Sequence, residues 1–407
     1  MKPKPVQKYT TLLSLYLAQS VPMSFFSTVL PVIMRMEDYS LEKIGLIQLV
    51  KIPWIIKFLW APMIDNSSHS NKGYKRWIFS AEIFYALVII SIGFYDLKTD
   101  MTTIIILMVL AFVLSATQDI ASDAFAVRIL KRDQRSYGNS MQSAGNFLGT
   151  LFGSGVLLMV YKIAGWQPLM WFLSGIVIIA LLPLIFYKDS QEIKRPDNRK
   201  RVQLKDVFSW FVLPNISKRL LILMFYYSGI IGILAMLKPY LVDLDYSINQ
   251  IAFISGIYGT SIGAASAFAG GWIIRRLGNK MSLRTFSLYA FVAGGIFVIG
   301  TFTGPSKFMI YAGVTLLWSA YAMSSTIIYT ISMNKVRAGK EGTDYTLQIV
   351  LTHLSGLIVA VLSGKIADLI EYQGLFILES SLALAAALIL PLLYEEEPVD
   401  AFSYANS

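Results

Sequence analysis

The 407-residue sequence contains no cysteine and only two histidines, and these absences exclude several classes of chemistry. Without cysteine the chain forms no disulfide and offers no thiolate to a metal or a substrate. His69 and His353 are far apart, so no pair of histidines has the spacing of metal ligands or of a catalytic site. We therefore expect a protein that is not an enzyme and holds no metal and no cofactor.

Charge is also scarce. Charged residues make up 15% of the chain and hydrophobic residues 55%, with a mean hydropathy of +0.58. A soluble domain carries about a quarter charged residues. A helix needs roughly 20 apolar residues to cross a hydrocarbon core about 30 Å thick. The sequence predicts an all-α membrane protein with twelve transmembrane helices, at 10–35, 42–64, 76–95, 101–128, 137–161, 166–187, 219–241, 249–274, 282–302, 307–333, 343–366 and 371–394.

One long polar segment divides these spans into two groups of six. We expect an N-terminal half (1–187), a basic cytoplasmic linker (188–215), a C-terminal half (216–394) and an acidic, disordered tail (395–407). The linker ends in an apolar stretch, 204–213, which is too short to cross and is predicted to form a helix on the membrane surface. Ser140-Met141-Gln142 and Thr346-Leu347-Gln348 each follow a basic loop, which indicates that the halves arose by duplication.

Lysine and arginine are distributed unevenly between the two sides of these spans. With the N-terminus inside, 26 of the 35 basic residues face the cytoplasm and 5 lie in the outer loops. Cytoplasmic loops of membrane proteins carry such an excess, so both termini are expected in the cytoplasm. The net charge of +10 is then explained by short loops that face anionic lipid, and we expect no nucleic-acid partner.

Small residues recur at every fourth position in two spans, which leaves one helical face almost without side chains. Two interpretations are open: static helix packing, or a sliding seam between the halves where the fifth and eighth spans meet. The stripes are Gly145, Gly149 and Gly153 in the fifth span and Gly259, Gly263, Ala267 and Gly271 in the eighth.

Three charged residues are expected inside the membrane, where a charge is costly and therefore indicates function. Asp119 and Asp123 share one face of the fourth span, and Lys57 in the second span lies at a similar depth. A lysine between two carboxylates lowers the cost of all three, and protonation of one acid would weaken its hold on the lysine. The cluster therefore predicts proton coupling; the alternative is a permanent ion pair that ties the two helices together.

Other polar and aromatic side chains are weaker candidates for contact with a solute. Lys51 either meets a substrate anion or extends to the membrane surface. His353 either carries a proton or is hydrogen-bonded within the bundle. The aromatic residues either line a cavity or provide ordinary packing. The candidate set is Gln118, Lys51, Tyr226, Tyr227, Trp318, Tyr321 and His353.

Two loops have features of a gate. Asp65 ends the second span before a basic loop, and it can bond to the N-terminus of a neighbouring helix and to Arg128. Gly271 and Arg275 end the eighth span in the corresponding way. These contacts would hold the inner side shut.

The motifs of the first half resemble one branch of a known family. Residues 57–65 (KFLWAPMID) and 115–124 (SATQDIASDA) are similar to the AmpG-like muropeptide permeases of the major facilitator superfamily. Acetyl-CoA transporters and bacterial siderophore importers are similar in the same places, and 15–22 (LYLAQSVP) with Pro53-Trp54 is somewhat closer to the siderophore group. The resemblance implies a monomer of the bacterial inner membrane that imports a bulky, partly anionic solute with protons. The cargo implied is a muropeptide or, alternatively, a siderophore, and another anionic or nucleotide-like solute also stays open.

Overall fold

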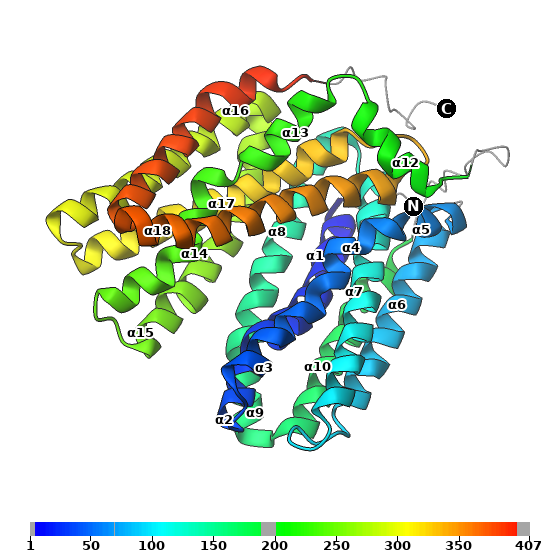
Figure 1. Ribbon diagram of the computed structural model, residues 1–407. Helices are drawn as coiled ribbons and strands as arrows, with labels where there is room; N and C mark the ends of the chain where they lie inside the picture. Colours follow the sequence, from blue (N-terminus) through cyan, green and yellow to red (C-terminus); the bar gives the residue numbers. More distant parts are fainter. Residues whose placement is uncertain (1–4, 69, 189–200, 397–407) are drawn as a thin grey trace.

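The computed structural model describes residues 5–68, 70–188 and 201–396, and every regular element in them is a helix (Figure 1). The N-terminal half contains α1 (Pro5–Ser24), η1 (Phe25–Val29), α2 (Leu30–Met36), α3 (Leu41–Leu46), η2 (Ile47–Lys51), α4 (Ile52–Ile56), η3 (Lys57–Leu59), α5 (Ala61–Ser67), α6 (Asn71–Ile92), α7 (Met101–Ile129), η4 (Arg132–Gln134), α8 (Arg135–Leu151), η5 (Phe152–Val156), α9 (Leu157–Ala164), α10 (Trp166–Ala180) and α11 (Leu182–Phe186). Helices cover the residues of the first six expected spans, several of them as consecutive short pieces.

The rest of the described chain, from the end of the linker through the C-terminal half, has fewer but longer elements. They are α12 (Leu204–Ser209), η6 (Trp210–Val212), α13 (Ile216–Phe225), α14 (Ser228–Asp243), α15 (Ile248–Ile251), η7 (Ala252–Tyr258), α16 (Gly259–Thr303), α17 (Lys307–Asn334) and α18 (Glu341–Leu393). The backbone leaves the helical region inside α16 at Gly278 (φ 77°) and inside α18 at Glu371 (φ 60°). Among the described residues, eight helices are long and apolar enough to cross a membrane, or nine with the bent pair Glu42–Leu59 and Ala61–Ser67. The count of twelve stays a prediction.

The expected second span is broken by its prolines. Pro53 lies in the first turn of α4 and Pro62 in the first turn of α5, where a missing N–H is tolerated. Between them the chain forms the 3₁₀ turn η3. The two parts of the span, Glu42–Leu59 and Ala61–Ser67, are inclined to each other by 51°. This break matters for the site because it places Lys57 in the turn, with its side chain fully buried.

The two halves meet near α5 and α12 and diverge toward α2, α9 and α15 (Figure 1). The main contacts between them are those of α18 with α4, η3, α5 and α7 and those of α8 with α16 and α17, and η5 also contacts η7. Hydrogen bonds between the halves run from residues 65–143 of the first half to residues 322–345 of the second. We call the end that carries Asp65 and Arg128 the closed end, and the opposite end the open end.

One of the two glycine stripes does not lie between the halves. An ideal Cβ on Gly145, Gly149 or Gly153 would strike Tyr16, Ser20 or Val21 of α1, so this stripe serves packing within the N-terminal half. The seam interpretation is therefore wrong for the fifth span, because the glycine face of α8 turns toward α1. In the eighth span, by contrast, an ideal Cβ on Gly263 would contact Phe147 of α8, and one on Gly271 would contact Ser140.

We expect Gly149→Ala to destabilise the protein. The added Cβ would lie 2.3 Å from the Cβ of Ser20 and 3.0 Å from its backbone carbon, so α1 would have to move. Overpacking of this kind costs about 1–3 kcal/mol. Gly155→Ala is the matched control, because nothing lies within 4 Å of its new Cβ. Thermal unfolding should show a lower midpoint for Gly149→Ala alone, and equal midpoints would contradict the packing described.

The short helix expected at the end of the linker is present as α12 and η6. Val207 and Trp210 are buried against the C-terminal half, while Phe208 and Val212 are 62% and 81% exposed. Its location on a membrane surface stays a prediction. Residues 189–200 of the expected linker and 397–407 of the acidic tail lie outside the described residues.

Candidate functional site

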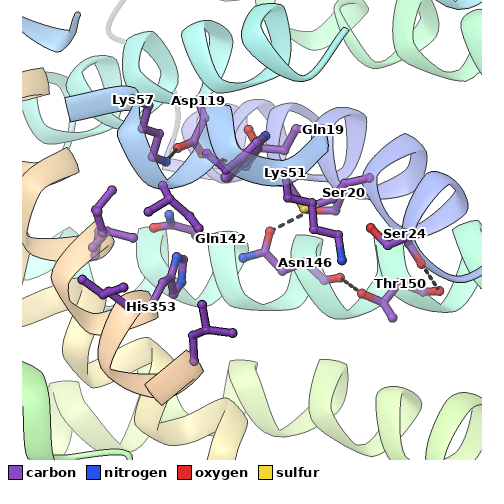
Figure 2. A pocket seen from close by; sticks show the side chains of 18 of the residues that line it. Gln19, Ser20, Ser24, Lys51, Lys57, Asp119, Gln142, Asn146, Thr150 and His353 are labelled. Carbon is purple, nitrogen blue, oxygen red and sulfur yellow. Dashed lines mark hydrogen bonds and ion pairs between the residues drawn. The ribbon is translucent and has the colours of Figure 1, made fainter. Parts of the chain in front are cut away.

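A cavity of about 460 Å³ lies between the halves, and its two walls differ in chemistry (Figure 2). The N-terminal wall is mostly polar or charged, and the C-terminal wall is mostly apolar. The first wall is formed by Gln19, Ser20, Met23, Ser24, Ser27, Thr28, Lys51, Trp54, Ile55, Lys57, Asp119, Gln142, Asn146 and Thr150, and the second by Tyr329, Ile349, Val350, His353, Leu354 and Leu357.

Lys57 and Asp119 form a buried ion pair in the N-terminal wall, between Lys57 Nζ and Asp119 Oδ2. The second oxygen, Asp119 Oδ1, accepts a hydrogen bond of 2.8 Å from Gln19 Nε2 on α1. The ring of Trp54 lies 4.4 Å from the Lys57 ammonium, on which it exerts a cation–π attraction. Both charges are therefore compensated, as buried charges must be if they are not to destabilise the fold.

Asp123, one turn along α7, has different partners. Its Oδ1 accepts hydrogen bonds from Tyr16 Oη at 2.7 Å and from Gln142 Nε2 at 3.2 Å. The expected arrangement of Lys57 between two carboxylates is corrected here: Lys57 pairs with Asp119, because α1 and α8 supply the donors on the side that Asp123 faces. Gln142 in turn accepts a hydrogen bond of 2.8 Å from Tyr345 Oη on α18, across the boundary between the halves.

The closed end is held by Asp65 and the N-terminus of α18. Asp65 Oδ1 accepts from the backbone N–H of Gly342 at 2.9 Å. Asp65 Oδ2 accepts from the N–H of Thr343 at 2.8 Å and from its hydroxyl at 2.7 Å. Tyr74 Oη adds a hydrogen bond of 2.7 Å to Oδ1. A carboxylate at a helix N-terminus satisfies backbone N–H groups that have no partner within the helix and interacts favourably with the helix dipole.

Arginines add further contacts between the halves at the same end. Arg128 on α7 pairs with Glu341 of α18 at 3.4 Å and donates to Asn71 at 2.7 Å. Arg135 donates to the side chain of Asn334 at 2.9 Å. The predicted gate residue Gly271 packs closely on α8, and the guanidinium of Arg275 lies 5.4 Å from the ring of Tyr137. All four predicted gate residues therefore lie at the closed end.

Known proteins resemble this chain over most of its length. The profile of the Major Facilitator Superfamily matches residues 11–359. The chain belongs to this superfamily. The anhydromuropeptide permease of Escherichia coli (strain K12) is 21% identical over 383 residues, which cover 93% of this chain and 78% of the permease. Putative transporter AmpG 4 of Rickettsia conorii is 23% identical over 391 residues, covering 92% and 93%. The resemblance to AmpG-like transporters is thereby confirmed.

A solved structure shares the fold of this superfamily member. The fucose:proton symporter FucP of E. coli superposes with a TM-score of 0.74 at 16% identity, over 97% of this chain and 100% of FucP. The likeness confirms an all-helical major facilitator fold. The protein is therefore a multi-pass membrane transporter, and the cavity between its halves is the candidate transport site.

The cavity of this superfamily member contains two of the predicted solute contacts, Lys51 and His353. Lys51 reaches into it from the N-terminal wall and His353 from α18 (Figure 2). Neither side chain has an ion pair or hydrogen bond among the described residues. Because Lys57 is neutralised by Asp119, Lys51 is the one uncompensated cation among the cavity-lining residues, all of which are described.

The other predicted solute contacts lie outside the cavity. Gln118 faces α1 and hydrogen-bonds the Ser122 hydroxyl at 3.0 Å, because it points about 100° away from Asp119 on the same helix. Tyr226 donates to the backbone of Leu283 inside the C-terminal half, and Tyr227 packs on Tyr321. Trp318 and Tyr321 pack edge-on against Phe147 of α8. These aromatic residues provide packing in this conformation, which is the second of the two interpretations that the sequence left open.

The polar wall formed by α1 and α8 is the part of the site that sequence reasoning missed. Ser20 donates to Asn146 at 2.8 Å, and Ser24 donates to the backbone of Thr150 at 3.2 Å. A signal was available in the fifth span. Gln142, Asn146 and Thr150 recur at four-residue spacing beside the glycine stripe, which marks a polar helix face inside a membrane segment.

Proposed function

We propose that this transporter couples proton entry to the uptake of a bulky, partly anionic solute across the bacterial inner membrane by alternating access. The observation that carries the proposal is the cavity itself: a buried Lys57–Asp119 pair, a second acid behind it and the uncompensated Lys51. Charged groups inside a membrane bundle mark substrate and proton pathways. The free cation attracts an anion, and the acids provide groups that can bind and release protons.

The contacts at the closed end support alternating access. They consist of hydrogen bonds and ion pairs between side chains and one helix N-terminus, and such contacts can be exchanged for water. The basic loops lie at this end, so by the positive-inside rule it faces the cytoplasm, together with both termini. The conformation described is then open to the outside, with the cytoplasmic exit shut.

The break points in the two longest helices support twelve crossings. Gly278 divides α16 into parts of about 30 Å or more, counting the residues of α15 and η7, and Glu371 divides α18 in the same way. The broken second span and α6, which carries Lys72, Lys75, Arg76 and Glu82, provide the remaining crossings. With the linker between α11 and α12, this gives six helices in each half, in a protein that we expect to act as a monomer.

A muropeptide is the cargo that we favour. A relative named for muropeptide transport, the anhydromuropeptide permease of E. coli, matches 93% of this chain. The hydroxyl and amide groups of α1 and α8 suit a sugar and peptide solute, and Lys51 suits its carboxylate. A ferric siderophore is the alternative cargo, and the apolar face of α18 favours it because such chelates often carry apolar groups beside their anionic ones.

The proposed function is tested by transport into proteoliposomes. Purified protein is given labelled anhydromuropeptide or, in a parallel assay, a labelled ferric siderophore, with the lumen more alkaline than the medium. We expect the muropeptide to accumulate above its external concentration and to leak out when a protonophore is added. Accumulation of the chelate alone would establish the alternative cargo. Equal levels with and without the gradient would contradict proton coupling.

We expect Lys51→Gln to weaken transport of the anionic solute. Hydrogen bonds to charged groups contribute roughly 1.5–3 kcal/mol, so KM should rise about 10–100-fold while kcat changes less. Lys51→Arg is the matched control, because it keeps the charge and should stay within a few-fold of wild type. The kinetics of initial uptake separate KM from kcat. An unchanged KM for Lys51→Gln would show that the anion binds elsewhere.

A further inference from the structure

The two carboxyl oxygens of Asp123 differ in their surroundings. The side chain is completely buried, and Oδ1 accepts two hydrogen bonds, from Tyr16 and Gln142. Oδ2 is also buried and has no hydrogen-bond partner among the described residues. The titratable and charged side chains that interact with Asp123 electrostatically, from α1, η3, α7, α17 and α18, are Tyr16, Lys57, Asp119, Tyr329 and Tyr345.

The one cation in this set is already engaged, because Lys57 forms its ion pair with Asp119. An ionised Asp123 would therefore be a buried charge with hydrogen bonds on one oxygen and nothing on the other, which is a costly arrangement. A proton on Oδ2 removes the charge and leaves Oδ1 as a carbonyl oxygen that accepts from Tyr16 and Gln142. The geometry fits the neutral acid.

Building on the proposed function, we infer that Asp123, rather than Asp119, holds the coupled proton in this conformation, and that Gln142 is the positioning residue that links this proton to closure. Gln142 lines the cavity, donates to Asp123 and accepts from Tyr345 of the opposite half. Its one amide therefore satisfies the acid and bridges α8 to α18 at the same time.

Proton release from Asp123 is thereby tied to opening of the closed end. When the halves separate at the closed end, α18 moves away from α8 and the Tyr345–Gln142 hydrogen bond breaks. Water then reaches Asp123 from that side, accepts the proton from Oδ2 and hydrates the remaining carboxylate. While the closed end is shut, Asp123 is neutral, so Lys57, Asp119 and Asp123 together carry no net charge. No excess negative charge then weakens the attraction of Lys51 for an anion. Anion binding and protonation of Asp123 therefore favour each other, as linkage requires.

The test uses the absence of native cysteine. Spin labels are attached at Ile163→Cys in α9 and Phe308→Cys in α17, positions 84% and 80% exposed. Both lie at the open end, far along their helices from Arg135 and Asn334, which meet at the closed end. Pulsed EPR in lipid nanodiscs then measures their separation between about pH 5 and about pH 9, without solute and without a gradient.

We expect the long separation to dominate at low pH and the short one to grow as Asp123 loses its proton. The ratio of the two should change by up to about tenfold per pH unit, the limit for one linked proton. Asp123→Asn should hold the long separation at every pH. Glu82→Gln is the matched control, because it neutralises a fully buried acid of the same half outside this network, and it should keep the wild-type profile. A wild-type profile in Asp123→Asn, or no pH dependence in wild type, would overturn the inference.

The role of Gln142 is tested by two variants of this residue in the same distance measurement. Gln142→Met fills the same space without donating or accepting, so it should lower the long-separation fraction at every pH. Gln142→Glu can still donate and accept when protonated. The Gln142→Glu variant should therefore recover the long separation at low pH. The ratio of long to short separations should depend more steeply on pH, because both Asp123 and the introduced glutamate must be protonated. If Gln142→Met behaves like wild type, Gln142 only fills space and the link to closure is refuted.

A second measurement covers the case in which Asp123→Asn fails to fold. Infrared spectroscopy of the Glu82→Gln/Glu379→Gln protein, which lacks two other buried acids, should show the C=O band of a neutral carboxylic acid that disappears at high pH. Absence of such a band would overturn the inference. Neither experiment involves a solute, so failure of the uptake assay and failure of this proton assignment are distinguishable.

Discussion

Asp119→Asn is expected to abolish proton-driven uptake, by at least about 100-fold, because losing one partner of a buried ion pair costs roughly 3–5 kcal/mol. Asp119 accepts from both Lys57 and Gln19, so the variant leaves a buried ammonium without its counter-ion. Asp123 is the nearest remaining acid, and Lys57 would then turn to it and keep it ionised. The variant should still insert into the membrane, which is checked by its yield and its elution as a single species.

The double variant Lys57→Gln/Asp119→Asn decides between coupling and structure. Removing both charges relieves the unpaired ammonium, so folding stability should recover. If the pair only ties two helices together, uptake recovers as well; if the pair takes part in coupling, uptake stays low. Glu82→Gln, another buried acid in the same half, should leave uptake close to wild type. Gradient-driven accumulation at the wild-type level in Asp119→Asn would refute the coupling role of this pair.

Asp65→Ala is expected to open the closed end. Asp65 accepts hydrogen bonds from two backbone N–H groups and one hydroxyl of α18, and all of them cross between the halves. Hydrogen bonds to a charged group contribute about 1.5–3 kcal/mol each, so even partial loss should reduce the population of this conformation about 10–100-fold. The spin labels at the open end measure this change as a shorter separation.

Asp133→Ala is a suitable control for that experiment, because Asp133 is an exposed acid at the same end of the molecule. It should leave the separation unchanged. Asp65→Asn keeps one acceptor oxygen and should fall between wild type and Asp65→Ala. A separation that is the same in Asp65→Ala and in wild type would mean that the remaining contacts, among them Arg128 with Glu341 and Arg135 with Asn334, hold the end shut by themselves.

The segment that precedes and forms α12 also spans the closed end. Asn66 of the N-terminal half exchanges two hydrogen bonds with the backbone of Val202, at 2.6 and 2.8 Å. On the other side, Lys340 of the C-terminal half pairs with Asp206 at 2.9 Å. Burial raises the pKa of Asp206, but the Gln203 N–H and Lys340 lower it more, so it lies below the usual range. Asp206 is thus an anion at neutral pH, and its contact with Lys340 adds to closure.

Much of the site could be predicted from the sequence because burial in lipid restricts the choices severely. Lys57 and Asp119 are partners in the structure because an intramembrane charge needs one and few were available. Asp65 meets a helix N-terminus because a carboxylate at a loop finds its best partners there. Lys51 and His353 line the cavity, although nothing in their own helices indicated which interpretation would hold.

Other parts required the fold. The choice of Asp119 over Asp123 as the ion-pair partner of Lys57 depended on Tyr16 and Gln142. These two residues come from helices distant in sequence and donate hydrogen bonds to Asp123. The glycine face of α8 turned to α1 and not to α16, and the aromatic residues near Trp318 packed on Phe147 instead of facing the cavity. Helical periodicity says which residues share a face, but it does not say what that face meets.

The sequence by itself determined that the chain is a helical membrane protein and that Lys57 and Asp119 are buried in it. These are local properties, since apolar length and the cost of a charge in lipid depend on a single segment. Only the tertiary structure decided which acid each donor reaches, which walls enclose the cavity and which end is shut. Those outcomes depend on the rotation and position of each helix against its neighbours, and these come from the packing of all helices together.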